Sequence, residues 1–440
     1  MTTDLMARQQ QGEHIDMMTR TLRVTAAAAA CLSLLAGTIG VAGASTRLSA
    51  PRAKAHASSV TLDFPSWQAT EPGYEQFYDS MIKQFDAAHP GVKVHFYEVT
   101  YDNYMQTITT RMAAGDAPDI LVLPLTNYGT FAASGQMTNL NSYLAGTDIL
   151  NSWAPLQKSL KINGKYYNVL VQGASYVLYA NQQILKAHHM AMPRTVAQLI
   201  TDAKQLTGNG SYGIALPTAQ DPNIPNFVMA LVTGQGYSAL KNNTYDFTNP
   251  GVQSAVNEYR QLAKYAAPGL ITEQSRQIYF SGKAAFMLDG TFELPAIKQQ
   301  GTASVAANTV MLPFPTKYQV SYVSSTLGIP ASIPSADKQL VWDFIKQVTE
   351  PASQRLFVKD IEAPAPRLSV DSTGAYPFGA VQNAAARGRD IVPSQPWFVE
   401  NYGEISTDLG TAMSKLLSSN ASTDAVLKAL EGELPPAGKS

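Results

Sequence analysis

Cysteine is almost absent from this chain, and its scarcity limits the available chemistry. The 440 residues include one cysteine, Cys31. A single thiol cannot form an internal disulfide or a thiolate cluster for a metal ion. The six histidines include the pair His188-His189, which we interpret as surface loop residues because no cysteine or spaced acidic partner accompanies them. We therefore expect neither a metal site nor a cofactor.

Charged residues are also scarce. They make up 15% of the sequence, below the usual level of roughly 25%, and the net charge is −1. Without a basic surplus to neutralise phosphates, nucleic-acid binding is not expected. The sequence also lacks a G-x-S-x-G nucleophile motif and metal-ligand spacing. Hydrophobic residues make up 45% of the sequence, which indicates a packed globular protein, and a length of 440 residues suggests two or three domains.

Long apolar runs are missing except for one near the N-terminus. Two arginines precede the run Val24 to Gly43, and a small-residue site follows at Ala42-Gly43-Ala44. This order is typical of a secretory signal peptide, although the run is also long enough for an uncleaved anchor. We predict that residues 1–57 are a signal peptide or an N-terminal anchor with a linker, and Cys31 is a candidate for lipid attachment. The expected location is exported, either periplasmic or tethered to the outer face of the cell membrane.

The stretch Lys161 to Leu185 contains the main signals for the predicted division of the chain into two lobes. Asn163-Gly164 is a two-residue hairpin signal. Two strand-like runs follow, Val169 to Val171 and Tyr176 to Tyr179, separated by the small and polar residues 172–175. They could form a corner within one sheet or leave one domain for another. We favour the second interpretation, a first crossing between two lobes beside a ligand cleft, because 440 residues are too many for one core.

The residues before this stretch alternate between strand and helix patterns. Strands are predicted at 60–64, 92–97 and 120–123, and helices lie between them, including an apolar stripe from Tyr74 to Phe85. Right-handed crossovers would make this β-α-β-α-β unit a parallel sheet covered by helices. A second α/β unit is predicted from about 172 to 305, with N-caps at Thr195 and Asn249.

Loops at the carboxyl ends of strands supply the first candidate ligand residues. In open α/β sheets the ligand lies beyond these strand ends. Trp67, Gln68 and Glu71 follow the first strand, and Asp119 and Tyr128 flank the third. They could form one wall of a cleft, or Trp67 could cover the core while Asp119 caps a turn. Both interpretations remain open at this point.

Six sequence segments, in this order, carry a resemblance to a known family. They are Phe85–Val94, Ala114–Ile120, Leu178–Leu185, Pro193–Leu199, Gly282–Met287 and the helices from Leu340 to Phe357. Together they resemble the family 1 extracellular solute-binding proteins of ABC importers, the group that includes maltose- and glycerol-phosphate-type binding proteins. Two positions depart from the family pattern: Ala180 replaces an aromatic residue, and Phe292 stands where tryptophan is common.

The resemblance implies an α/β fold of the two-lobed periplasmic-binding-protein type (type II-like), with a ligand cleft between lobes that are joined by crossing segments. Lobe one would contain residues 58–170 and 310–347, and lobe two residues 172–308 and 350–435. The three crossings would fall near 168–174, 306–312 and 345–352.

The family also implies a function, the capture of a mono- or oligosaccharide outside the membrane and its delivery to the transmembrane subunits of an ABC permease by lobe closure. Sugar sites combine aromatic faces with carboxylates, amides or arginine. The candidate ligand-binding residues are Trp67, Gln68, Glu71, Asp119, Tyr128, Tyr176, Asp289, Thr291, Phe292, Arg367 and Trp397. We expect a monomer that is not an enzyme.

Two other functions stay open from the sequence. A secreted glycosidase would need two carboxylates on either side of the scissile bond, and Glu71, Asp119, Asp289 and Glu293 offer candidates. A sensor module would instead present its ligand to a membrane receptor. Product analysis of a sugar mixture would separate the enzyme from the binding protein.

Overall fold

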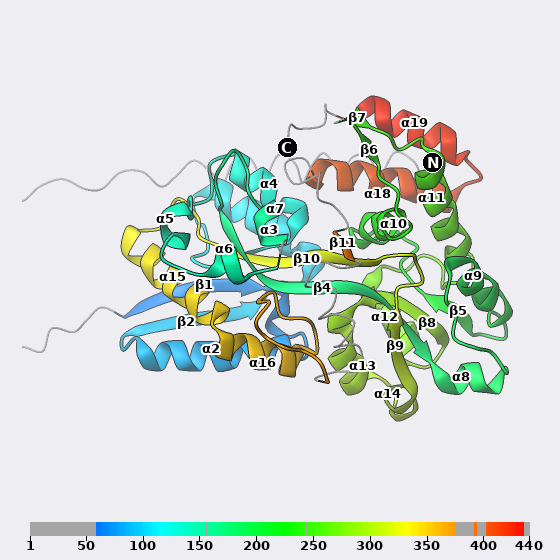
Figure 1. Cartoon of the computed structure of the whole chain (residues 1–440), viewed down its shortest axis with the longest axis horizontal. Coiled ribbons are helices and arrows are strands. Elements are labelled where there is room, and N and C mark those ends of the chain that lie inside the picture. The colour runs from blue at the N-terminus through cyan, green and yellow to red at the C-terminus, as the bar shows by residue number, and fades with distance from the viewer. Residues whose placement is uncertain (1–58, 155, 243, 375–390, 394–401, 435–440) are drawn as a thin grey trace, which may run out of the picture. The chain divides into compact units, whose positions relative to one another are not determined.

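The computed structural model describes residues 59–154, 156–242, 244–374, 391–393 and 402–434 (Figure 1). The chain divides into residues 1–56 and 57–440, and every described residue belongs to the second unit. The expected signal segment and the candidate Trp397 therefore lie outside the described residues. Within the described part, no helix is long and apolar enough to cross a membrane.

Two parallel strands begin the described chain. β1 (Val60–Ser66) and β2 (Val92–Glu98) pair along their full lengths, and α2 (Tyr74–Ala88) connects them. Alternation along β1 buries Leu62 and Phe64 on the face that α2 covers. These positions confirm the predicted strands and helix. Because the strands are parallel, the loops that follow them meet at one edge.

The third predicted strand pairs differently from the expectation. α3 (Tyr101–Ala114) leads to β3 (Leu121–Leu123), and β3 pairs with β10 (Gln319–Gly328) in the antiparallel direction. The expected three-stranded parallel sheet is therefore wrong at this strand. The backbone N–H groups of Asp119 and Ile120 donate to the Asp63 carbonyl, so the chain touches β1 just before β3 turns to β10.

One long strand, β4 (Asn168–Asn181), replaces the two predicted strands. Its first half pairs with β10, and its second half pairs with β8 (Ala284–Gly290) and β9 (Thr309–Pro313). The polar residue Gln172 does not interrupt the strand. Its buried side-chain oxygen accepts hydrogen bonds from Gln68 and from Ser325 of β10, so the amide is satisfied inside the protein. Figure 1 shows β4 and β10 running side by side through the middle of the molecule.

The hairpin before β4 is confirmed. Asn163 and Gly164 both have positive φ, at 48° and 79°, and Ile162 pairs with Lys165 across the turn. Two positive φ values in succession are those of a type I′ turn, which explains the Asn-Gly pair.

The second α/β unit surrounds β5 (Tyr212–Ala215) and β8, which are parallel neighbours. The larger sheet has the strand order β11-β10-β4-β8-β5, with β3 on β10 and β9 on β4. Its helices and connecting turn are α8 (Gln182–Ala187), α9 (Val196–Gln205), α10 (Asn223–Gly234), α11 (Pro250–Ala263), α12 (Thr272–Phe280), η2 (Thr291–Glu293), α13 (Leu294–Gln300) and α14 (Ala303–Asn308). The predicted caps are confirmed: Thr195 accepts from the Gln198 N–H, and Asn249 accepts from the first turn of α11.

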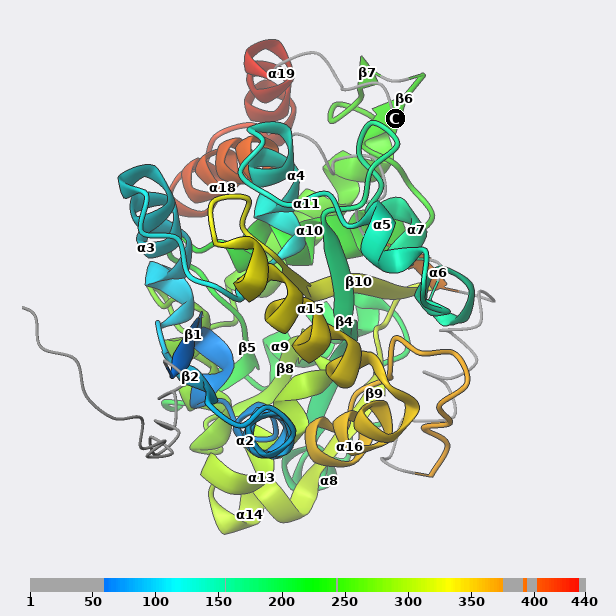
Figure 2. The same ribbon diagram turned by 90° about the vertical axis from the view of Figure 1, so that its left-hand side faces the viewer.

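The C-terminal helices pack in two different parts of the molecule. α15 (Ser335–Thr349) and α16 (Pro351–Ile361) pack on α2, as Figure 2 shows. α18 (Tyr402–Ser418) packs on α4 and α10, and α19 (Thr423–Glu433) packs on α11. The remaining short elements are η1 (Trp67–Ala69), α4 (Leu125–Ala133), α5 (Asn141–Leu144), α6 (Ile149–Ser152), α7 (Leu156–Ser159), β6 (Leu240–Lys241), β7 (Thr244–Tyr245) and β11 (Ile391–Pro393).

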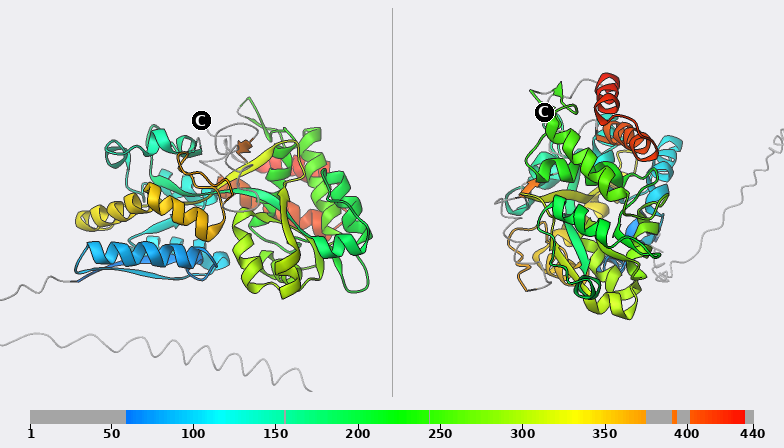
Figure 3. Two further views of the ribbon diagram at one scale, coloured as in Figure 1. Left: turned by 60° about the horizontal axis from the view of Figure 1, so that its bottom comes forward. Right: turned by 90° about the vertical axis from the view of Figure 1, so that its right-hand side faces the viewer.

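Buried apolar side chains form two clusters, one around β1, α2, α15 and α16 and one around α9 to α11, α18 and α19. Strand β4 contributes to both: Val177 and Tyr179 face the first, and Leu178 and Ala180 face the second. Figure 3 shows the two groups of helices on either side of the central strands. Phe357 of α16 belongs to the first cluster, and so do Tyr279 and Leu294 of the second α/β unit. The clusters therefore do not separate the two lobes, and the predicted lobe boundaries stay predictions.

Candidate functional site

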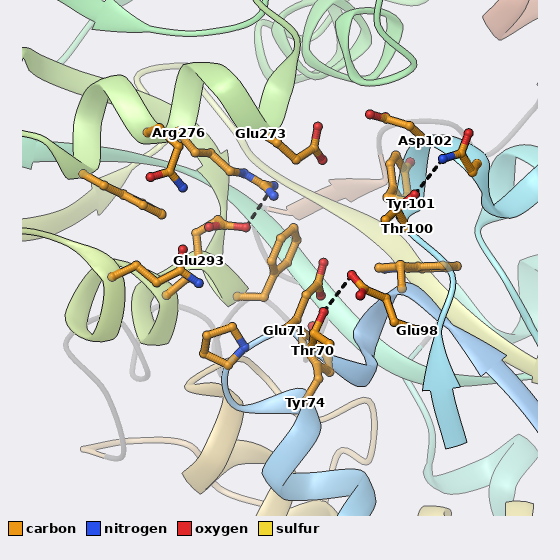
Figure 4. A pocket seen from close by; sticks show the side chains of 18 residues that line it. Thr70, Glu71, Tyr74, Glu98, Thr100, Tyr101, Asp102, Glu273, Arg276 and Glu293 are labelled. Atoms are coloured by element: carbon orange, nitrogen blue, oxygen red, sulfur yellow. Dashed lines mark hydrogen bonds and ion pairs between the residues drawn. The ribbon is translucent and has the colours of Figure 1, made fainter. Parts of the chain in front are cut away.

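A cavity of about 390 Å³ lies between the first αβ unit and helices of the second. Its lining residues are Trp67, Thr70, Glu71, Pro72, Tyr74, Glu98, Thr100, Tyr101, Asp102, Asn103, Glu273, Arg276, Gln277, Phe280, Phe292, Glu293, Ala296 and Gln300. Figure 4 shows the loop and helix of the first unit on one side, and Glu273, Arg276 and Glu293 on the other. The volume falls within the range of about 300–1,000 Å³ that is usual for small-molecule sites.

The first wall is built where β1 and β2 end. Trp67 begins η1 directly after β1, and Glu98 is the last residue of β2. Ser66 fixes the turn, because its hydroxyl accepts from the Gln68 N–H at 3.1 Å. Thr70 donates to Glu98 at 2.9 Å, which ties the two strand ends together.

Trp67 lines this wall while most of its ring is covered. Its side chain is 8% exposed and meets Tyr101 and Tyr104 edge to face, at ring distances of 5.4 and 4.8 Å. Edge-to-face pairs at this distance are favourable. The sequence left open whether Trp67 covers the core or forms a wall of the cleft. In the structure it does both, because it packs on the core and also lines the cavity.

The second wall is held by a buried ion-pair network. Arg276 of α12 donates from Nε and Nη2 to the two carboxylate oxygens of Asp289, at 2.9 and 3.1 Å. Its Nη2 also lies 2.9 Å from Glu293 Oε1. The side chains are 16% exposed in Arg276, 5% in Asp289 and 6% in Glu293. Burial lowers the pKa of Arg276, but the two carboxylates outweigh it and raise this pKa overall, so the guanidinium stays charged.

The other acidic side chains of the cavity have no ion-pair partner among the described residues. Burial raises the pKa of Glu71 to about 7, although Arg276 opposes the shift. Burial likewise raises the pKa values of Glu273 and Asp102. Glu273 Oε2 is buried and accepts no hydrogen bond from any described residue. The cavity is therefore aromatic, acidic and only partly neutralised.

The structure brings some of the predicted ligand residues together. Trp67, Glu71 and Phe292 line the cavity. Asp289 stands behind it and holds Arg276 in place. Gln68 is next to Trp67 in the chain and Thr291 is next to Phe292, but both are buried, with 1% and 0% of their surface exposed. The Gln68 amide donates to Gln172 and Ser325, at 2.6 and 3.0 Å.

The other predicted residues lie away from the cavity lining. Asp119 accepts from the Asp63 N–H at 2.8 Å, and the Tyr128 hydroxyl donates to the Leu160 carbonyl. Tyr176 packs against Phe227 and Phe314. Arg367 pairs with Asp148 at 2.8 Å and lies over Trp153. Trp397 is outside the described residues. Ligand contact by these residues stays a prediction.

Several lining residues were missing from the sequence prediction. Tyr101 and Asp102 follow β2 as Trp67 follows β1, so the rule that found the first loop applies to the second as well. Arg276 gave no comparable signal. It lies in a helix, and its role depends on Asp289 and Glu293, which reach it only in the folded chain.

Comparison with known proteins identifies the family. The model of the family described as bacterial extracellular solute-binding protein matches residues 80–385. The chain belongs to this family. The recognition made from six sequence segments is thereby confirmed.

Relatives with curated descriptions support the same conclusion. The glucose-binding protein GlcS of Saccharolobus solfataricus is 28% identical over 221 residues, which is 44% of this chain and 39% of the relative. The maltotriose-binding protein of Pyrococcus abyssi is 21% identical over 244 residues, covering 53% of this chain and 51% of the relative. The chain thus spans about half or less of the length of these relatives.

Solved structures show the fold. A solute-binding protein of Thermotoga lettingae, bound with α-D-tagatose, aligns with a TM-score of 0.75 at 20% identity, covering 85% of this chain and 98% of that one. Maltose-bound MalE3 of T. maritima aligns with a TM-score of 0.74 at 18% identity, with coverage of 85% and 98%. The predicted two-lobed α/β fold is confirmed.

The family also decides between binding and catalysis. Its members are extracellular binding proteins, and two relatives are described as lipoproteins. The glycosidase alternative is not favoured. Of its four candidate carboxylates, Asp119 does not line the cavity, and Asp289 and Glu293 are both paired with Arg276.

Proposed function

We propose that this solute-binding protein captures a carbohydrate outside the cell membrane and delivers it to an ABC permease, and that the cavity beside Trp67 is its ligand site. The observation that carries the proposal is the combination of aromatic rings and carboxylates around one cavity between the two αβ units. The partly exposed rings of Tyr101 and Phe292 suit the apolar faces of a sugar, and carboxylates accept from its hydroxyls.

Delivery would follow from closure of the two walls on the ligand. Trp67 and Glu71 come from the strand ends of the first unit, while Arg276 and Phe292 come from α12 and η2 of the second. A ligand that touches both walls binds the closed arrangement better than an open one and shifts the population toward it. The closed form would dock on the permease as a monomer. The protein would be held in the periplasm or tethered to the outer face of the cell membrane.

Thermal unfolding of the purified protein against mono- and oligosaccharides and polyols tests this proposal. A ligand at a hundredfold excess over its Kd stabilises the native state by about 2.7 kcal/mol, which raises Tm by several degrees. Chromatography of each mixture should return the sugar intact. Phe292→Ala removes one ring of the cavity and should reduce the shift, whereas Tyr237→Ala, at an exposed aromatic residue outside the cavity lining, should preserve it. A hydrolysed sugar, or equal shifts in both variants, would contradict the proposal.

A further inference from the structure

The charges around the cavity are unequal. Five carboxylates line it, from Glu71, Glu98, Asp102, Glu273 and Glu293, and the lining includes one cationic side chain, that of Arg276. This imbalance is local, because the net charge of the whole chain is −1. A cavity of one sign concentrates ligands of the opposite charge and disfavours ligands of the same charge.

Arg276 does not correct the imbalance. Its Nε and Nη2 groups are engaged by Asp289, which stands behind the lining, and by Glu293. Two carboxylates therefore already face this one cation. Glu71, Asp102 and Glu273 have no ion-pair partner within the described part of the chain, so the charge that each carries when ionised remains for the cavity. Glu71, with a pKa of about 7, is about half ionised at neutral pH.

A buried oxygen in this wall supplies a second, separate observation. Glu273 Oε2 is shielded from solvent and receives no hydrogen bond from the described residues. Buried polar atoms are normally satisfied, and an unsatisfied carboxylate oxygen is costly. Glu273 lines the cavity, so a rotation of its side chain would bring this oxygen to a donor on a ligand, and a cationic donor would also offset the charge.

The aromatic rings of the cavity favour the same kind of ligand. Trp67, Tyr74, Tyr101 and Phe292 line it together with the carboxylates, and the Arg276 guanidinium already lies over the Phe292 ring at 5.9 Å. Ring faces attract cations as well as the apolar faces of sugars. A neutral sugar would use the rings but would leave the charge imbalance in place. An anionic sugar would increase the repulsion.

We infer that the cavity selects a carbohydrate bearing a protonated amine, with Glu71 and Glu273 as the residues that distinguish it from its neutral parent. This inference rests on the proposed function, because it names the class of ligand that the same site takes. The ammonium group would lie between the two carboxylates and the rings, and the hydroxyls would bond the remaining polar groups.

Matched sugars test the selection directly. Glucosamine, glucose and N-acetylglucosamine share one ring but differ in charge, as do galactosamine and galactose, and the deacetylated and acetylated chitin disaccharides. Titration calorimetry at pH 7 should give a Kd for the amine at least about tenfold lower than for its neutral partners. Raising the salt from 20 to 500 mM should reduce this preference and leave the neutral sugars unaffected.

Three carboxylate variants connect the preference to named residues. Glu71→Gln and Glu273→Gln keep the side-chain size and remove one charge each, so the amine should bind about tenfold more weakly in either variant while its neutral partner is unchanged. Glu75→Gln is the matched control, because Glu75 is exposed on α2 and does not line the cavity. The salt dependence of the natural protein provides the same test if a variant fails to fold.

The outcomes separate this inference from the proposed function. If a neutral sugar binds as tightly as its amine, the inference is wrong and carbohydrate binding stands. If putrescine or spermidine binds and sugars do not, the cavity selects amines without a sugar ring, and both proposals fail. If no compound in either set binds, the proposed function fails, and the inference fails with it.

Discussion

The two walls of the cavity are held by different forces. The wall that follows β1 and β2 depends on neutral contacts, with Trp67 packed edge to face on Tyr101 and Tyr104. The opposite wall depends on charge, with Arg276 fixed between Asp289 and Glu293. Both are largely buried. One cavity thus combines a wall in which Trp67 is held by packing that should be independent of pH and salt with a wall in which Arg276 is held by ionised partners.

The difference matters for a protein that must close on its ligand. Edge-to-face rings and apolar burial tolerate small shifts in position, whereas a two-pronged guanidinium–carboxylate pair has a fixed geometry. We infer that the ionic wall is the reference surface on which a ligand is oriented. The aromatic wall would supply contact area. The predictions below separate these roles, beginning with the largest expected effect.

Removing Arg276 should damage the ionic wall most. Arg276→Met leaves Asp289 and Glu293 buried without their cation, which should lower the free energy of unfolding by about 3–5 kcal/mol. Urea denaturation at pH 7 measures the loss. Arg111→Met is the comparison, because Arg111 pairs with Asp63 at 2.7 Å but the two side chains are 21% and 27% exposed. There the loss should be about 1 kcal/mol, and equal losses in the two variants would show that burial does not set the difference.

Truncating Trp67 should damage the neutral wall slightly less. Trp67→Ala removes both ring contacts, and we expect a loss of about 3 kcal/mol, the low end for a buried tryptophan because water can enter from the cavity. Trp67→Phe keeps an aromatic ring and should lose less than about 1.5 kcal/mol. Urea unfolding at pH 5.5 and pH 8 should give the same loss for Trp67→Ala. A loss that changes between these pH values would mean that this wall also depends on charge.

The neutral wall is also the part of the site that sequence patterns could predict. Period-2 alternation located β1 and β2, and the rule for parallel strand ends led to Trp67 and Glu71. Local signals likewise located the Asn163-Gly164 turn and the helix cap at Thr195. In each case the signal that located the element lies within a few residues along the chain.

The ionic wall could not be predicted in this way. Arg276 is separated by 13 residues from Asp289, and nothing in its helix marks it as a member of a network. The continuity of β4 was missed for a similar reason, because Gln172 interrupts the apolar pattern and its partners Gln68 and Ser325 lie 104 and 153 residues away. The place of a buried polar residue in a strand or helix can be predicted only when its distant hydrogen-bond partner is known.

The Gln68 amide tests how much such a distant partner contributes. Gln68 is buried and donates to Gln172 and Ser325 behind the neutral wall. Gln68→Ala removes both donations but leaves the Ser325–Gln172 hydrogen bond in place, so we expect a loss of about 1–2 kcal/mol in urea unfolding. Gln76→Ala, on α2, is a control for an exposed amide that bonds within its own helix start. A loss no larger than that of the control would mean that the network contributes little.

The smallest expected effect concerns Glu71, whose carboxylate lies where the two walls meet. Its pKa is raised from 4.5 to about 7 by burial, with Glu273, Asp289 and Glu98 adding to the shift and Arg276 opposing it. A raised carboxyl pKa means that the native state holds the proton more tightly than the unfolded state. The contribution of Glu71 to stability is therefore most favourable below pH 4.5 and falls as the pH rises toward 7, after which the loss is constant.

Glu71→Gln has no proton to lose, so it should escape this loss. Its Tm should match that of the natural protein near pH 4.5 and exceed it above pH 7 by about 2 °C, corresponding to about 1 kcal/mol for a half-buried side chain in a protein of this size. Glu75→Gln should show no such divergence, because Glu75 is exposed. Parallel Tm curves for Glu71→Gln and the natural protein would show that water keeps the Glu71 carboxylate solvated. Glu71 would then be ionised throughout this pH range, and its contribution to amine binding should be the same at pH 6 and pH 7.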